Sequence, residues 1–261
     1  GPVLPNDLAF RKSLAAQVMV NVLIISSVLI VYALTALHRA EAALAAEHER
    51  AETLLETIMP RAIADRLKSA PEERIADSHE AVTVLFADLV GFTPAARNLT
   101  PNEVVGYLDG LFRAFDRLVE KAGAEKIKTI GDAYMVVGGL EGPPDLAARA
   151  IGQLALDMMQ TIHECEPLND VRLNLRIGLH TGPAIAGVIG KRRYSYDVWG
   201  DAVNVASRME SHSIPGRIQV TEAFRDMAGA AFQFEDREPI EVKGVGAMKT
   251  AFLIGGLSSQ Q

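Results

Sequence analysis

This sequence has almost no cysteine and no excess of basic charge. Only one of the 261 residues is a cysteine, Cys165, so no internal disulfide can form and a reducing compartment is expected. The 33 Asp and Glu outnumber the 26 Lys and Arg, which gives a formal net charge of −7. Because nucleic-acid binding is driven by clustered Lys and Arg, we expect no nucleic-acid partner. With 49% hydrophobic residues the chain can bury a full core, which excludes disorder over most of its length.

Charge is also absent from the apolar stretch between Leu14 and Leu37. This run is longer than the roughly 20 residues with which a helix crosses a bilayer, so residues 1–37 are predicted to hold a transmembrane helix that contacts membrane lipid. A buried soluble helix, or one packed on a partner, is the alternative. Basic residues flank the run on both sides and leave its orientation open.

Residues 38–68 are predicted to form a helical linker. From Leu37 onward, apolar residues recur at alternating steps of three and four, as in the seam of a short coiled coil. The one polar residue in this seam is Glu47. The seam consists of Leu37, Ala40, Leu44, Glu47, Ala51, Leu54 and Ile58. Met59-Pro60 should end this helix, and a second short helix over residues 61–68 leads into a polar linker. A single helix packed on its own globular domain is the alternative.

Strand and helix patterns alternate over residues 80–255, which we interpret as one globular domain, followed by a tail at 256–261. In "AVTVLFADLVGFT" the carboxylate of Asp88 interrupts a buried strand, a costly position unless its charge is needed. The segment from Thr100 to Glu103 has capping-box spacing and predicts a helix that ends near Gly123. Gly131-Asp132 divides two strand-like runs and predicts a hairpin with a second carboxylate at its tip.

The second half of this domain carries further polar residues at element ends. Alternation over residues 171–182 predicts a half-buried strand with Arg176 on its polar face, where His180 is expected to be structural. A helix beginning near Gly200 should present Asn204 and Arg208 on one face, since they lie four residues apart. Lys243 is expected at a glycine-rich hairpin turn.

Five motifs, in order and at the expected spacing, carry a family resemblance: "FADLVGFT", "KIKTIGDAYM", "RIGLHTG", "YDVWGDAVNVASRME" and "EVKGVGAMKT". Together they resemble the catalytic domain of class III adenylyl and guanylyl cyclases. The resemblance implies an α+β, ferredoxin-like domain with a central, mainly antiparallel sheet, here preceded by the transmembrane and coiled-coil helix. The helices before the domain also resemble those of mycobacterial membrane-anchored adenylyl cyclases.

By resemblance, Asp88 and Asp132 are the metal-binding carboxylates, and the backbone carbonyl of Leu89 is a further ligand. The implied cofactors are two divalent cations, Mg²⁺ or Mn²⁺. Magnesium favours oxygen ligands and is commonly held by one or two carboxylates, with water and substrate phosphate as its other ligands. A metal would therefore explain the buried charge of Asp88.

The resemblance also assigns the substrate contacts. Lys128 and Asp197 match the base-selecting pair, and a donor beside an acceptor suits adenine rather than guanine, so ATP is the implied substrate. Asn204 and Arg208 match the transition-state pair of the family. Its triphosphate contacts correspond to Arg176 and Lys243.

The implied activity is conversion of ATP to 3′,5′-cyclic AMP and pyrophosphate, at sites shared across a homodimer. The catalytic domain should face the cytosol from the cell membrane. A guanylyl cyclase is the alternative within the family. A membrane signalling module that binds nucleotide without turnover is the alternative from another class.

Overall fold

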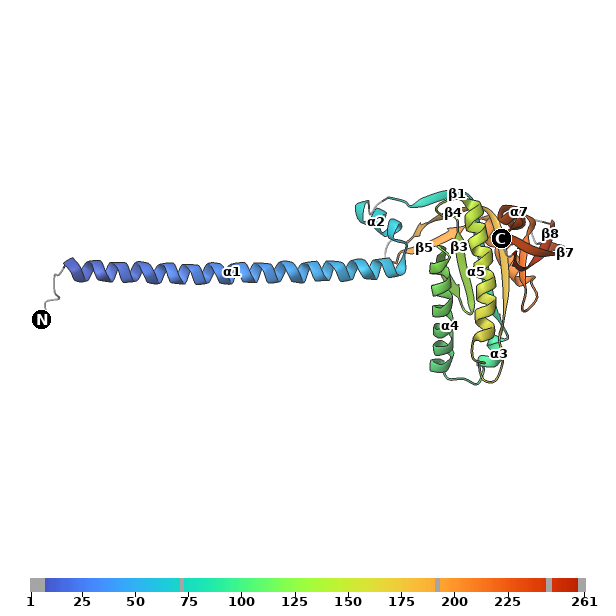
Figure 1. The fold of residues 1–261 in the computed structure, drawn as a ribbon, viewed down its shortest axis with the longest axis horizontal. Helices are drawn as coiled ribbons and strands as arrows, with labels where there is room; N and C mark the ends of the chain where they lie inside the picture. Colours follow the sequence, from blue (N-terminus) through green and yellow to red (C-terminus); the bar gives the residue numbers. More distant parts are fainter. Residues whose placement is uncertain (1–7, 71–72, 191–192, 243–245, 258–261) are drawn as a thin grey trace. The chain divides into compact units, whose positions relative to one another are not determined.

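The structure is a computed structural model that describes residues 8–70, 73–190, 193–242 and 246–257. The chain divides into two compact units, residues 1–68 and residues 69–261. The first unit is helical, and the second combines a sheet with helices. Most elements of the chain are labelled in Figure 1. The elements are α1 (Leu8–Ile58), α2 (Arg61–Ser69), β1 (Ala76–Val90), α3 (Phe92–Ala96), α4 (Pro101–Lys121), β2 (Glu125–Ile130), β3 (Ala133–Gly138), α5 (Pro144–Glu164), β4 (Asn174–Ile189), β5 (Ser195–Trp199), α6 (Asp201–Ser211), β6 (Ile218–Thr221), α7 (Glu222–Ala228), a 3₁₀ turn (Gly229–Ala231), β7 (Phe232–Val242) and β8 (Gly246–Gly256).

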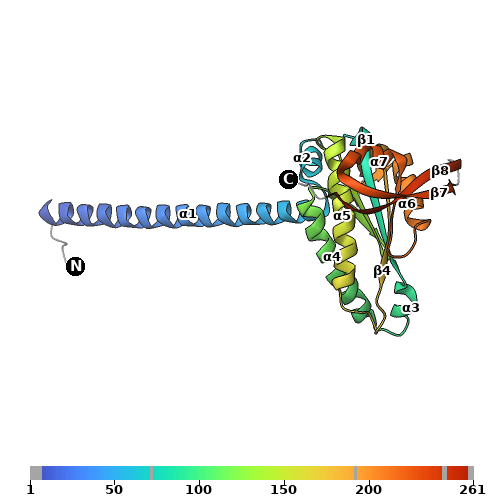
Figure 2. The same ribbon diagram turned by 45° about the vertical axis from the view of Figure 1, so that its right-hand side comes forward.

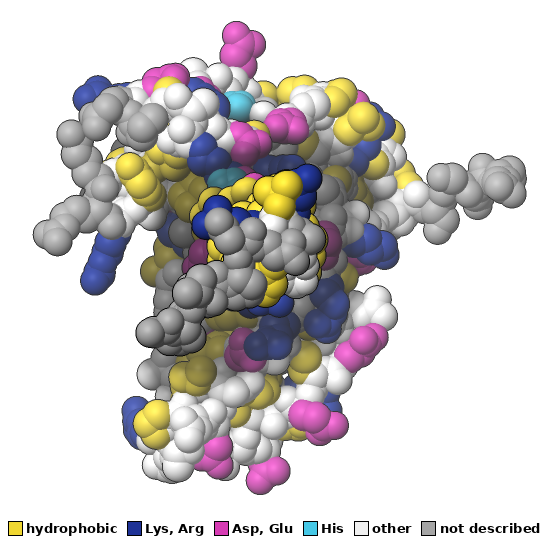
Figure 3. Space-filling view, turned by 90° about the vertical axis from the view of Figure 1, so that its left-hand side faces the viewer, with side chains coloured by type: hydrophobic (Ala, Val, Ile, Leu, Met, Phe, Trp, Pro, Cys, Tyr) yellow, Lys and Arg dark blue, Asp and Glu magenta, His cyan; other side chains and the backbone are white. Residues whose placement is uncertain are grey.

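The first unit contains one continuous helix, α1, which holds both the apolar run and the seam of the predicted coiled coil. As predicted, α1 ends just before Met59-Pro60 and α2 begins just after it, because proline disfavours helical backbone at the preceding residue. Lys68 of α2 forms an ion pair with Glu52 of α1 at 2.8 Å. By length and composition, α1 is long and apolar enough to cross a membrane. Its hydrophobic side chains are exposed, and those near its start are visible in Figure 3.

The second unit is built on one sheet with the strand order β2-β3-β1-β4-β6-β8-β7, and β5 pairs with β4. Every pairing of named strands is antiparallel except that between β4 and β6. This mixed but mainly antiparallel sheet, with helices against it, confirms the predicted α+β fold class. The central strands β1 and β4 carry three of the nine residues that were predicted to form the site, namely Asp88, Leu89 and Arg176.

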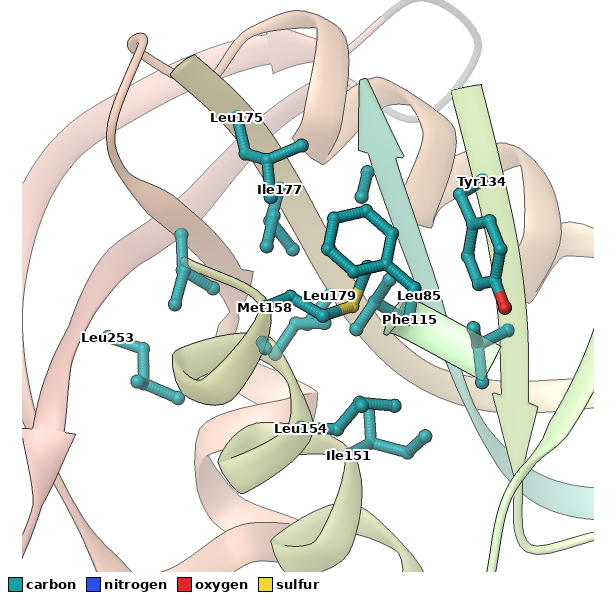
Figure 4. Close-up of a cluster of buried hydrophobic side chains, with 14 of the residues drawn as sticks. Leu85, Phe115, Tyr134, Ile151, Leu154, Met158, Leu175, Ile177, Leu179 and Leu253 are labelled. Carbon is teal, nitrogen blue, oxygen red and sulfur yellow. The ribbon is translucent and has the colours of Figure 1, made fainter. Parts of the chain in front are cut away.

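Helices α4 and α5 lie side by side against one face of the sheet (Figures 1 and 2). Side chains from β1, β3 and β4 interdigitate with theirs in the main core, where Leu85, Phe115 and Met158 are fully buried (Figure 4). Alternate residues of β1 point to the opposite face, where Val84 and Phe86 pack with residues of α6. Both faces of β1 are therefore buried between Val82 and Leu89, which explains why this part of its sequence is mainly apolar.

Local signals placed several element ends correctly. Thr100 caps α4 through a capping box, in which its backbone N–H donates to Glu103 Oε2 at 2.8 Å and its hydroxyl accepts from Glu103 N at 3.4 Å. Gly123, with φ of 62°, follows the end of this helix. The Gly131-Asp132 hairpin joins β2 and β3 as predicted, and Gly131 adopts the left-handed conformation.

Two strand boundaries differ from the prediction. Ala76–Glu80, expected within a polar linker, form the start of β1, and Ala76 to His79 pair with β4. This part of β1 is only half covered, so its polar sequence lacks a clear strand pattern. The next strand was expected from Val171, but β4 begins at Asn174 and reaches Ile189. Asn169 and Asp170 have positive φ and make a tight turn that leaves Val171 42% exposed.

Candidate active site

Asp88 lies near the end of β1, on the sheet face that carries Phe86 and contacts α6. In the sheet it stands between Ala133 of β3 and Arg176 of β4. Arg176 donates from Nη2 to Asp88 Oδ2 at 2.9 Å. The carboxylate is half-buried, and burial raises its pKa, with the negative charge of Asp132 adding to the rise. Asp88 is thus a carboxylate whose negative charge is incompletely compensated.

Asp132 occupies the hairpin turn directly before Ala133, the β3 neighbour of Asp88. The two predicted metal-binding carboxylates therefore lie at one end of the sheet, close enough for the charge of Asp132 to raise the pKa of Asp88. The side chain of Leu89 is buried in the main core, which leaves only its backbone for a ligand role. Across the described part of the chain, no group of three or more His, Cys, Asp and Glu side chains could hold a metal.

A pair of carboxylates fits a magnesium-type ion, which is bound through oxygen and commonly keeps water and phosphate in its other positions. The raised pKa of Asp88 points the same way, because a cation would relieve its burial and the repulsion from Asp132. Cyclase domains of this kind use divalent metal ions generally. These residues suit such an ion.

Arg176 connects this carboxylate end to α6. Besides its bond to Asp88, it donates from Nε to Glu210 Oε1 at 2.8 Å. Glu210 is 8% exposed, and burial raises its pKa against the opposing effect of Arg176. The guanidinium therefore lies between two carboxylates, one on β1 and one on α6.

Lys128 and Asp197 are brought together from β2 and β5. Lys128 Nζ lies 2.5 Å from Asp197 Oδ2, and Asp197 Oδ1 accepts a hydrogen bond from Val198 N at 2.8 Å. The side chain of Asp197 is 15% exposed and that of Lys128 is 40% exposed, so the pair stands at the surface with its acceptor held in place. The predicted base-selecting pair is thus assembled.

Helix α6 carries the predicted transition-state pair. Asn204 is exposed and Arg208 is half-buried, one turn further along the helix. The helix packs directly on β4 at Gly178, where a Cβ would lie 2.0 Å from Glu210 N and 2.6 Å from Ala206 O. No residue other than glycine fits at position 178 under this helix, which explains the first glycine of "RIGLHTG".

The predicted residues fall into two groups at different ends of β4. Arg176, near the start of β4, pairs with Asp88, whereas Gly187, near its end, pairs with Asp197. Within the described residues, no hydrogen bond or ion pair joins Asp88, Asp132 or Arg176 to Lys128 or Asp197. Lys243 lies outside the described residues, between the end of β7 and the start of β8.

His180 has the structural role that was predicted for it. Its Nδ1 lies 2.8 Å from the hydroxyl of Thr221, and burial lowers its pKa to about 4. The ring is therefore neutral at pH 7 and unsuited to act as a cationic phosphate contact.

Glu210 is a site residue that the sequence reading missed. The buried positions of α6 are Ala202, Val205, Ala206, Met209 and Glu210. Because they follow helical spacing, the sequence signal was a carboxylate on the apolar stripe of an amphipathic helix, which requires a buried partner.

The adenylate and guanylate cyclase catalytic domain family matches residues 75–255. An adenylate cyclase of Mycobacterium bovis is 47% identical over 224 residues, which cover 86% of this chain and 51% of that protein. The chain thus spans about half the length of this curated relative.

Two solved structures are also similar. The guanylate cyclase domain of RhGC from Catenaria anguillulae in complex with GTP has a TM-score of 0.67 and 34% identity, covering 69% of this chain and all (100%) of that one. The catalytic core of a rhodopsin-guanylyl cyclase with converted specificity in complex with ATPαS has a TM-score of 0.66 and 36% identity, covering 69% and 98%. Both kinds of cyclase are therefore among the relatives. The chain belongs to the adenylate and guanylate cyclase catalytic domain family, class III of the nucleotidyl cyclases.

Proposed function

We propose that this protein is an adenylyl cyclase that converts ATP to 3′,5′-cyclic AMP and pyrophosphate. The observation that carries the proposal is the pairing of Lys128 with Asp197 at 2.5 Å. The N1 atom of adenine is an acceptor and its amino group is a donor, whereas guanine has the opposite polarity at these positions. A lysine donor beside a carboxylate acceptor therefore matches adenine. The 47% identity with a mycobacterial adenylate cyclase supports the same substrate.

The reaction is an in-line attack of the ribose 3′ oxygen on the α-phosphate. The attacking oxygen forms a bond to phosphorus as the bond to the leaving pyrophosphate breaks, and the proton of the 3′ hydroxyl passes to water. Two divalent cations, Mg²⁺ or Mn²⁺, held by Asp88, Asp132 and the Leu89 carbonyl, supply charge neutralisation and activation of the hydroxyl when bound.

The protein side chains act by positioning and electrostatics. Asn204 orients the ribose, and Arg208 stabilises negative charge that develops on the α-phosphate. Arg176 and Lys243 hold the triphosphate through charge-assisted hydrogen bonds. No side chain is assigned as a general base.

The sites are shared across a homodimer. Cyclase domains related to this one bind nucleotides and act as dimers. In this chain the carboxylate group and the base-selecting pair lie at different ends of β4. A second copy would bring the Lys128–Asp197 pair, Asn204, Arg208 and Lys243 of one subunit to the carboxylates and Arg176 of the other, which makes two sites from two chains.

Helix α1 anchors the protein in the cell membrane, and the catalytic domain faces the cytosol. Support comes from the length, apolar composition and complete exposure of the span. ATP is available on the cytosolic side, which fixes the side of the catalytic domain.

Incubation of the purified chain with ATP or GTP and with Mg²⁺ or Mn²⁺, followed by chromatography of the products, tests the proposal. We expect cyclic AMP and pyrophosphate, with a rate that rises more than linearly with protein concentration while the dimer forms. Cyclic GMP as the main product would instead assign a guanylyl cyclase. Absence of turnover in a chain shown to be dimeric would favour a silent nucleotide-binding module.

A further inference from the structure

The carboxylate of Glu210 is buried, and a buried charge is unfavourable unless it is paired. It lies on the apolar stripe of α6, next to Met209, which is fully buried. Its Oε2 accepts a hydrogen bond from the Ser211 hydroxyl at 3.1 Å, and its Oε1 accepts from Arg176 at 2.8 Å. Loss of one partner from a buried ion pair is strongly destabilising, so this carboxylate and the guanidinium depend on each other.

The backbone around Glu210 packs directly against β4. Contact between α6 and the strand at Gly178 is so close that a single added carbon would lie 2.0 Å from Glu210 N. The carboxylate therefore projects from a backbone that lies against β4, and it reaches Arg176, two residues before Gly178 on the same strand. This arrangement defines where the guanidinium stands.

The orientation of Arg176 leaves part of the guanidinium for another ligand. Nε is directed to Glu210 and Nη2 to Asp88. An arginine has five N–H donors, and within the described residues Nη1 makes no hydrogen bond. Without Glu210, both Nε and Nη2 would be free to form a bidentate pair with Asp88, which is the strongest geometry for arginine and carboxylate. That pair would compete with a cation for Asp88.

We propose that Glu210 is a positioning residue: it holds Arg176 by Nε, keeps the guanidinium from closing on Asp88, and so leaves Asp88 available to a divalent cation and Arg176 available to the triphosphate. This inference rests on the proposed function and deepens it. It also couples α6, which carries Asn204 and Arg208, to the strand that carries the metal-binding carboxylate.

The test uses the full chain with Glu210→Gln, which keeps the shape of the side chain and removes its charge. Mn²⁺ binding is measured by electron paramagnetic resonance without nucleotide, and KM and kcat for ATP are measured separately. We expect the dissociation constant for Mn²⁺ and the KM for ATP each to rise about tenfold, equivalent to about 1.4 kcal/mol, with a smaller change in kcat. The matched control is Glu235→Gln, which breaks an exposed arginine pair (Arg217 Nη2 to Glu235 Oε2, 2.7 Å) and should change neither constant.

An Arg176→Gln background separates positioning from a general charge effect. If Glu210 acts through Arg176, adding Glu210→Gln in that background should not weaken Mn²⁺ binding further. An equal loss in both backgrounds, or unchanged Mn²⁺ binding in Glu210→Gln, would overturn the inference. Should Glu210→Gln fail to fold, Glu210→Asp keeps the charge but shortens the reach, and wild-type Mn²⁺ affinity and KM in that variant would overturn it too.

The Mn²⁺ arm does not depend on turnover. A wild-type chain that binds Mn²⁺ but makes no cyclic nucleotide would refute the proposed function and leave this inference to be decided by the variants. A wild-type chain that binds no Mn²⁺ would refute the inference itself.

Discussion

The backbone nitrogen of Glu210 occupies the space in which a side chain at Gly178 would begin, 2.0 Å from an ideal Cβ. This contact sets how closely α6 can approach β4 and thereby the distance from the sheet at which Asn204, Arg208 and Glu210 project. The helix that carries the proposed transition-state pair thus depends on the absence of a side chain on the strand beneath it.

Gly178→Ala is expected to push α6 off the sheet. Overpacking of this kind costs about 1–3 kcal/mol of the free energy of unfolding, and displacement of the helix should lower activity at least about tenfold. Urea unfolding and a cyclase assay measure the two effects. Gly106→Ala, on α4 with no atom within 4 Å of its Cβ, is the control and should gain about 0.5–1 kcal/mol. A neutral Gly178→Ala would show that α6 tolerates displacement.

Asp88→Ala should abolish cyclase activity, at least about 100-fold, while the chain stays folded and dimeric. Burial already disfavours the charge of Asp88, and Arg176 keeps Glu210 as a partner after the change. Removal of metal with EDTA should have the same effect on the wild type, reversed by added Mg²⁺ or Mn²⁺. Activity assays and sedimentation measure these outcomes, with Asp109→Ala, on the exposed face of α4, as control. Retained turnover in Asp88→Ala would remove the metal assignment.

The double change Lys128→Glu with Asp197→Cys should shift the preference from ATP towards GTP, because the carboxylate then accepts from the guanine N1–H and amino group. The ratio of kcat/KM for the two nucleotides is the measurement. A second double change, Lys249→Glu with Glu222→Cys, alters an exposed pair with a 3.8 Å separation and should leave the ratio unchanged. Unaltered ATP preference in the first variant would show that this pair does not select the base.

His180 should make the protein less stable in mild acid. Its pKa is lowered by burial from 6.5 to about 4 in the folded chain, so the neutral ring is favoured in the native state. This contribution is fully present above pH 6.5 and is lost as the pH falls from 6.5 towards 4, by up to about 3 kcal/mol. Urea unfolding at pH 7 and pH 4.5 measures how much unfolding free energy the wild type and His180→Gln each lose in acid, and the wild type should lose more. Equal losses of stability in the two proteins would argue against it.

Deletion of residues 37–58 should weaken dimerisation and activity together, since a coiled-coil seam would hold the two catalytic domains near each other. Sedimentation velocity and the cyclase assay, run at the same protein concentrations, report both. Deletion of residues 1–36 removes the apolar span, keeps the seam and serves as the comparison. Full activity in a monomeric deletion variant would contradict two predictions: that the seam promotes dimerisation and that the active sites are shared between subunits.

Sequence patterns predicted most of the local structure, because their causes are local. Pro60 separates α1 from α2, and Thr100 with Glu103 begins α4 through bonds between near neighbours. The turn at Gly131-Asp132 could be predicted in the same way. The start of β1 could not be predicted, because this segment is a strand only through its pairing with β4.

Motif order, charge and periodicity lie along the chain, so they were enough to identify the cyclase family, the residue types of the site and the apolar helix. The contacts between side chains came from the tertiary structure. It set Lys128 against Asp197 across β2 and β5, and it placed Arg176 between Asp88 and Glu210. Such contacts join residues far apart in sequence, and they follow from strand register and from the close approach of α6 at Gly178. A linear pattern carries no information on these distances.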